Sequence, residues 1–348
     1  ASLSLWTAVG EFAKGKQKAK TTCRFATSAF SVQFLDKTFS IRMGVLSAAI
    51  IGILSSQSAF AISAADCTAM GSSCVAVSTT AEFNTALTSG SATTILLLNN
   101  ITMNSSVSVN QAASNRKNLV IDGGGFTLST GVFSFVFSGQ TNASWGGAGS
   151  FTLSNMTALT SALGEGNTVV SMLGNTSSVD IVIDNIGSVT DSMLAVLGIM
   201  GAGGTPNLNS QLILGNFTQP ISLTFGANHQ LAQASNIKFT GHFDLTATTG
   251  AYPAVFWTNS ANANSLMHFG STADVSITTP IFTDGSGGNG FYQYTLEDGA
   301  KFALNSGQNI FGSNNNGAQI GTYNSVTGFG SGAVLQLAAQ NGGAYATG

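Results

Sequence analysis

Two pairs of carboxylate side chains could do chemistry, and the first lies in the segment DIVID. Its Asp180 and Asp184 are four residues apart, so both side chains point to the same face of a strand. Such a pair could contribute to the oxygen cluster that holds calcium in a polysaccharide lyase, which also needs a basic residue to remove a proton. The single arginine after residue 61, Arg116, lies in the polar turn NRKN. We therefore expect Asp180 and Asp184 to form a solvated strand face.

The second pair, Glu297 and Asp298, is adjacent in the sequence. Hydrolysis of a glycoside needs two acids on one face of the site, whereas adjacent residues of a strand point to opposite faces. A turn before Gly299 is the better interpretation. Asp284, in TDGSGGNG, also has the surroundings of a turn acid, and nearby Ser286 lacks the GDSGS pattern of secreted serine proteases.

The other residues whose side chains could do chemistry are scattered along the sequence. His229, His242 and His268 have no metal-binding spacing, so we expect surface or gap-filling roles for them. The glycine-rich stretches GGGF, GAGG and GFGSG fit neither the dinucleotide fingerprint nor the phosphate-binding loop. The sequence therefore predicts a protein that is not an enzyme and has no catalytic residue, bound metal or cofactor.

The elements that must position these residues are short strands separated by turns rich in Gly, Asn and Ser. Four of them align on Leu245, Ile277, Leu304 and Leu337, at steps of 32, 27 and 33 residues. Repeats of this size, each one strand–turn–strand unit, predict a solenoid whose coils bury their faces on one another. A β-sandwich is the alternative, but its turns should recur every 8–12 residues or so without the longer rhythm.

A cap should precede the coils. Thr79 and Glu82 have the spacing of a capping box, which predicts a short helix that buries Phe83 and Leu87. The apolar run Ile95–Leu98 then predicts a buried strand. We divide the chain into a leader at 1–61, a cap at 62–90 and a β-helical region at 91–348.

Two cysteines lie in the predicted cap, Cys67 and Cys74. Their spacing is not that of a redox motif and no histidine is near them, so a structural disulfide is favoured. A bridge over so short a loop would stabilise the fold by about 2–3 kcal/mol.

The leader contains a secretion signal. The apolar run Met43–Leu54 is followed by SSQSAFA, with Ala59 and Ala61 at the −3 and −1 positions of a cleavage site. Cleavage is therefore predicted between Ala61 and Ile62. Twelve helical residues extend only about 18 Å, too short for a bilayer core of about 30 Å, so the segment is a cleavable signal and not an anchor.

A further segment precedes this signal and contains Trp6, Glu11, Phe12, Lys14 and Lys16 within SLSLWTAVGEFAKGKQKAK. It resembles the extended signal peptide region of type V secreted proteins of Gram-negative bacteria. The resemblance implies export by the Sec machinery and passage through an outer-membrane β-barrel translocator. The family pattern starts earlier, with a Met, an Asn and another aromatic residue, so we expect this chain to be a fragment.

Charge is divided unevenly along the chain. The leader holds seven of the eleven basic residues, and the remainder has four basic against twelve acidic residues, a net charge of −8. Few cations make nucleic acid and anionic lipid improbable partners. The negative charge would also repel polygalacturonate.

The order of segments from Val75 to Ala247 resembles pectate-lyase-like β-helices, above all the adhesive domain of bacterial surface proteins. The matching stretches are ILLLNNITMNSS, NLVIDGGGFTL, SFTLSNMT and VDIVIDNIG, and the later GAKFALNS and GAVLQLAA resemble the coils of autotransporter passengers. The resemblance implies an all-β, right-handed parallel β-helix with a short helical cap. It further implies a secreted adhesin of the cell surface that attaches to host cells or glycans. The alternatives are a secreted polysaccharide lyase or hydrolase and a passive stalk. We expect the translocator barrel beyond residue 348 or on a separate protein.

Overall fold

The computed structural model describes residues 61–109, 118–137, 149–162, 167–172, 178–198, 207–224, 230–248, 254–257, 265–283, 291, 293–308 and 325–339. These residues belong to one compact unit, Gln57–Gly348. Several predicted features lie outside the described residues: the extended signal segment with Trp6, Glu11, Phe12, Lys14 and Lys16, the apolar signal run, and Arg116, His229, Asp284 and Ser286.

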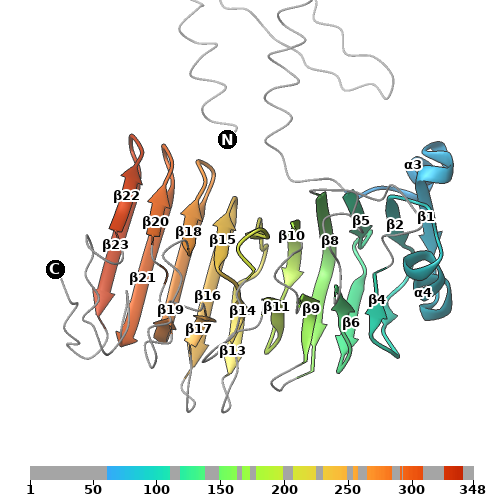
Figure 1. Ribbon diagram of the computed structural model, residues 1–348, viewed down its shortest axis with the longest axis horizontal. Helices are drawn as coiled ribbons and strands as arrows, with labels where there is room; N and C mark the ends of the chain where they lie inside the picture. Colours follow the sequence, from blue (N-terminus) through green and yellow to red (C-terminus); the bar gives the residue numbers. More distant parts are fainter. Residues whose placement is uncertain are drawn as a thin grey trace, which may run out of the picture. The chain divides into compact units, whose positions relative to one another are not determined.

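The described residues form an all-β parallel solenoid in which every strand pairs with strands of neighbouring coils (Figure 1). The path of the first sheet is β1 (Cys74–Val77), β2 (Thr94–Leu97), β5 (Asn118–Asp122), β8 (Gly149–Ser161), β10 (Val179–Ser188), β12 (Leu212–Leu214), β15 (Asn236–Phe239), β18 (Leu266–Phe269), β20 (Gln293–Leu296) and β22 (Ser325–Phe329). Two further strands join it, β3 (Ile101–Thr102) and β6 (Thr127–Gly131).

The second sheet is built from the other strand of each coil. Its members are β4 (Val107–Ser108), β7 (Phe135–Val136), β9 (Thr168–Met172), β11 (Met193–Leu197), β13 (Ile221–Thr224), β14 (Ala232–Gln233), β16 (His242–Thr248), β17 (Ala254–Trp257), β19 (Asp274–Thr283), β21 (Lys301–Gln308) and β23 (Val334–Ala339). Parallel pairing throughout the described strands rules out the β-sandwich alternative, which needs antiparallel sheets.

The register of the coils confirms the repeat read from the sequence. Leu245 pairs with Ile277, Ile277 with Leu304, and Leu304 with Leu337. All but Leu337 are buried, since alternate residues of each strand face the interior. The predicted solenoid is therefore correct, down to the residue-level alignment of these coils.

Phenylalanines fill the interior between coils. Phe239 and Phe269 occupy paired positions and their rings stack with centroids 5.2 Å apart. Phe302 continues the stack at 4.3 Å from Phe269. All three are 0–1% exposed, so the core is a column of rings that links successive coils.

Helices cover the beginning of the solenoid (Figure 1). α4 (Thr80–Thr88) starts with the predicted capping box of Thr79 and Glu82, and it buries Phe83 and Leu87 completely, which confirms the prediction. None of the described helices combines the length and apolar character needed to span a bilayer.

A second helix, α3 (Ala64–Ala69), was not predicted, although Ser63 and Asp66 form a capping box at its start. The short 3₁₀ turn η1 (Gly71–Ser73) follows it. A disulfide joins Cys67 of α3 to Cys74 of β1, and β1 pairs with β2. The helix is thereby tied to the first strand of the sheet.

One strand boundary differs from the sequence prediction. The buried strand expected over Ile95–Leu98 is β2, which ends at Leu97, and Leu98 is 38% exposed. Leu98 begins the turn to the next strand of the coil, so its side chain leaves the core.

The phenylalanine column can be tested by Phe239→Ala. We expect it to lower the free energy of unfolding by about 3–5 kcal/mol because it removes a buried ring and leaves a cavity. Urea denaturation followed by circular dichroism measures the change. Val132→Ala, at a side chain 58% exposed, should change stability by less than about 0.5 kcal/mol, and equal effects of the two substitutions would contradict the assignment.

Candidate functional site

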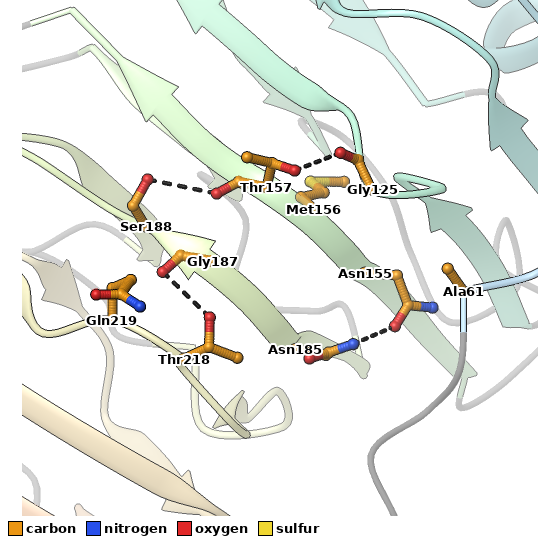
Figure 2. A pocket seen from close by; sticks show the side chains of 10 residues that line it. All are labelled: Ala61, Gly125, Asn155, Met156, Thr157, Asn185, Gly187, Ser188, Thr218 and Gln219. Atoms are coloured by element: carbon orange, nitrogen blue, oxygen red, sulfur yellow. Dashed lines mark hydrogen bonds between the residues drawn. The ribbon is translucent and has the colours of Figure 1, made fainter.

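A groove of about 510 Å³ lies at the bends of β8 and β10, two inner strands of the first sheet (Figure 2). Its lining side chains and glycines come from successive coils: Gly125, Asn155, Thr157, Asn185, Ser188 and Thr218. Ala61 lies at the end of the groove beside Asn155. The groove is thus made by stacking, because each coil contributes the same part of its turn.

Two asparagines in the left-handed conformation form the bend. Asn155 has φ 57° and Asn185 has φ 52°, a conformation that asparagine tolerates better than most residues. The Asn185 Nδ2 donates to Asn155 Oδ1 at 2.6 Å. Asn155 Nδ2 in turn donates to Asp122 Oδ2 at 2.7 Å. The amides therefore form a ladder across three coils.

This ladder ends on the carboxylate of Asp122, which is 1% exposed. Besides the Asn155 amide, it accepts a hydrogen bond from the Gly124 N–H at 2.8 Å and from the Ile62 N–H at 3.1 Å. A buried carboxylate is tolerated only when donors surround it. Asp122 therefore fixes both the bend of its own coil and the position of Ile62.

Close packing of the coils shapes the floor of the groove. A Cβ added at Gly187 would clash with the carbonyl oxygen of Thr157 in the coil before it. The hydroxyl of Thr218 donates to the Gly187 carbonyl at 3.5 Å, and that of Ser188 to the Thr157 carbonyl at 3.4 Å. Hydroxyl and amide groups thus line the groove at each level.

This lining can hydrogen-bond a ligand but offers it no charge. The described residues around the groove are of the types Ala, Gly, Asn, Met, Thr, Ser and Gln. Amides and hydroxyls both donate and accept, which matches a neutral ligand rich in hydroxyl groups. The acidic chain, with its net charge of −8 after residue 61, would oppose a polyanion.

The acidic pair of β10 contributes to coil stacking. Asp184 Oδ1 accepts from the Asn216 N–H at 2.7 Å, and Asp180 Oδ1 accepts from the Gln211 N–H at 3.3 Å. Burial raises the pKa of Asp180. Each carboxylate thus binds the backbone of the next coil. Within the described ranges, no group of three or more His, Cys, Asp or Glu side chains is placed to hold a metal ion.

A polar cluster missed by the sequence analysis lies on the outer face of the first sheet. Lys238, His268 and Thr295 occupy paired positions on β15, β18 and β20. His268 Nδ1 lies 2.7 Å from Thr295 Oγ1, and its Nε2 lies 2.7 Å from Glu297 Oε1. Lys238 Nζ is 3.9 Å from the same oxygen. The spacing of the coils, applied to polar residues, would have found this cluster.

Glu297 is the anionic centre of that cluster and follows β20, at the start of the turn predicted before Gly299. The pKa of Glu297 is lowered, first by the His268 hydrogen bond, then by the Ser271 N–H, and further by the charges of His268 and Lys238. The side chain is 42% exposed, so water screens these interactions. The cluster joins three coils on a solvent-facing surface.

The asparagine ladder is tested by comparing two substitutions at one position. Asn155→Ala removes the amide and places an unfavourable residue at positive φ, so it should cost about 2–4 kcal/mol of unfolding free energy. Asn155→Gly removes the same amide, but glycine adopts positive φ without strain. It should therefore cost about 1–2 kcal/mol less unfolding free energy than Asn155→Ala. Chemical denaturation measures both values. Equal costs would show that the positive φ at residue 155 does not disfavour alanine, which would contradict the assignment.

The lowered pKa of Glu297 predicts that this side chain makes the protein's stability sensitive to acid. A lowered carboxyl pKa contributes stability that is present above the usual glutamate range and is lost as pH falls through the folded-state value. Between pH 6 and pH 3, Glu297→Gln should therefore lose less stability than the parent protein, by at most about 1 kcal/mol because of solvent screening. Asp274→Asn is the matched control, since Asp274 and its partner Lys301 are 58% and 61% exposed. Parallel pH profiles for parent and Glu297→Gln would contradict the assignment.

Comparison with known proteins finds that part of the solenoid is similar to a described class of domain. Residues 74–194, from β1 into β11, match the model of the family of pectate lyase-like adhesive domains. The match includes Asp122, Asn155 and Asn185 and therefore most of the groove. No curated protein and no solved structure shows significant similarity to the chain. This chain thus contains a region similar to pectate lyase-like adhesive domains, folded as a parallel β-solenoid.

Proposed function

We propose that this protein is an adhesin of the cell surface whose groove binds a neutral, hydroxyl-rich glycan. The observation that carries the proposal is the uncharged, hydrogen-bonding groove within the region that matches the adhesive family. Sugar hydroxyls both donate and accept hydrogen bonds, as do the amides and hydroxyls that line it. Such contacts are individually weak.

Weak contacts suit adhesion because a cell presents many copies of a surface protein. Each neutral hydrogen bond adds about 0.5–1.5 kcal/mol, so a single groove would hold a sugar loosely. Many grooves that engage one glycan-coated surface together give a much higher avidity. An adhesin therefore needs no deep pocket.

Passive support of a more distal domain is a second candidate function. It is favoured by the in-register stacking from β1 to β22, since a solenoid can be lengthened coil by coil without changing its core. A stalk would not depend on the identity of the groove side chains, and this separates it from an adhesin.

We further propose that the protein reaches the surface by type V secretion. The predicted signal cleavage after Ala61 and the extended segment with Trp6 and Lys14 support this route. The partners would be the Sec machinery and an outer-membrane β-barrel translocator. A sparsely charged chain with a single small disulfide loop would thread such a pore unfolded and then fold outside by adding coils.

The groove is tested by glycan binding of the exported protein. Thr218→Ala and Gln219→Ala remove exposed groups from the groove rim, and each should weaken binding of a neutral oligosaccharide about 2- to 10-fold. Thr246→Ala, on an exposed face of β16, is the matched control and should leave the affinity unchanged. A glycan array followed by titration calorimetry provides the measurement.

Two outcomes would contradict the adhesin proposal. New reducing ends or unsaturated products, with or without added calcium, would show a hydrolase or lyase. A stalk would be shown by cell attachment that persists in both groove variants and also persists when a spacer of equal length replaces the solenoid.

A further inference from the structure

The nitrogen of Ile62 occupies an unusual position, because it donates a hydrogen bond to a carboxylate that is almost fully buried. Its distance to Asp122 Oδ2 is 3.1 Å, and Asp122 is 1% exposed. The other donors to Asp122 that the described residues supply are the neutral groups Gly124 N–H and Asn155 Nδ2. A hydrogen bond from a cationic donor to such a carboxylate is stronger than one from a neutral donor.

We propose that cleavage of the Ala61–Ile62 bond turns this nitrogen into an α-ammonium group that forms an ion pair with Asp122. The inference rests on the cleavage site predicted from the sequence. A signal-peptidase-class protease of the exporting cell would catalyse the step, in which water adds across the amide bond. The hydroxyl joins the Ala61 carbonyl carbon, the proton joins the Ile62 nitrogen, and a further proton from solvent makes that nitrogen cationic.

The geometry requires little movement after cleavage. Asp66 accepts hydrogen bonds from the N–H and the hydroxyl of Ser63, the residue next to Ile62. The helix α3 that follows is fixed to β1 by the disulfide between Cys67 and Cys74. The Ile62 nitrogen is therefore held at hydrogen-bond distance from Asp122 by the chain on its C-terminal side, which cleavage leaves intact.

Cleavage would also change the groove. Ala61 lies at the end of the groove beside Asn155 (Figure 2) and leaves with the leader. Asp122 accepts the amide of Asn155, which in turn accepts that of Asn185. The new ion pair would thus act on Asp122 Oδ2, the oxygen that also accepts the Asn155 amide. At the same time the groove wall would lose the residue that precedes the cut.

The ion pair has a defined pH dependence. Among the described residues, the titratable groups that hydrogen-bond here are Asp122, which accepts from the nitrogen, and Asp66, which accepts from the N–H of the next residue. A free α-amino group has a pKa of about 7.7–8.0, and a neighbouring carboxylate raises it. A raised amine pKa contributes stability that is fully present below about pH 8 and is lost as pH rises through the folded-state value.

The first test is the N-terminus of the exported protein. Mass spectrometry of the protein collected from the surface of a Gram-negative host should find Ile62 as its first residue. A different first residue, or retention of the leader, would overturn the inference.

The second test compares one full-length chain before and after cleavage in vitro. Residues 58–61 are replaced by the factor Xa recognition sequence Ile-Glu-Gly-Arg, so that cleavage leaves Ile62 at the N-terminus. At pH 6.5 cleavage should raise Tm by roughly 3–6 °C, and the gain should disappear near pH 10. Asp122→Asn should abolish the gain at pH 6.5.

A matched control keeps Asp122 intact in case Asp122→Asn fails to fold. Moving the recognition sequence to residues 57–60 leaves Ala61 at the N-terminus, so the Ile62 nitrogen stays a neutral amide. This protein should show no pH-dependent gain. The inference is overturned if the gain persists at pH 10 or appears equally in the control. These measurements do not involve a glycan, so their outcome tests the ion pair independently of the proposed adhesion.

Discussion

Coil-to-coil pairing in register is the constraint on which the rest of this structure depends. Every described strand bonds parallel strands of its neighbours, so a residue at one level lies directly above its counterpart at the next. The stacking of Phe239 on Phe269 and the amide contact between Asn155 and Asn185 are both consequences. Inside, register produces a continuous apolar column; at the bends, it produces a continuous polar ladder.

The polar ladder explains how a chain with few charges builds an uncharged polar groove. Asn155 and Asn185 bend the strands at positive φ and hydrogen-bond to each other. Asp122 ends the ladder inside the protein and holds Ile62 there. Fold and groove therefore share the same residues, and the segment next to the predicted cleavage site is part of the groove's support.

Much of the fold could be predicted from sequence because its signals are local or periodic. The capping box of Thr79 and Glu82 needs only three-residue spacing, and the leucine and isoleucine alignment needs only a repeat near 30 residues. Both are present in the structure. The Asp122–Asn155 contact was not predictable in this way. The contact depends on turns of unequal length and on a residue in the left-handed conformation, and a hydrophobic pattern predicts neither of these. The cluster of His268 and Glu297 was missed because polar residues were not carried through the repeat that aligned the apolar ones.

We propose that the stacked turns near Asn155 and Thr218 form a glycan-binding groove. The most direct measurement is a crystal structure of the exported protein soaked with a neutral oligosaccharide selected from the array. We expect intact sugar rings in the groove, with hydroxyl groups within hydrogen-bond distance of Asn185 or Thr218. Sugar bound to the second sheet, or cleaved sugar anywhere on the protein, would contradict it.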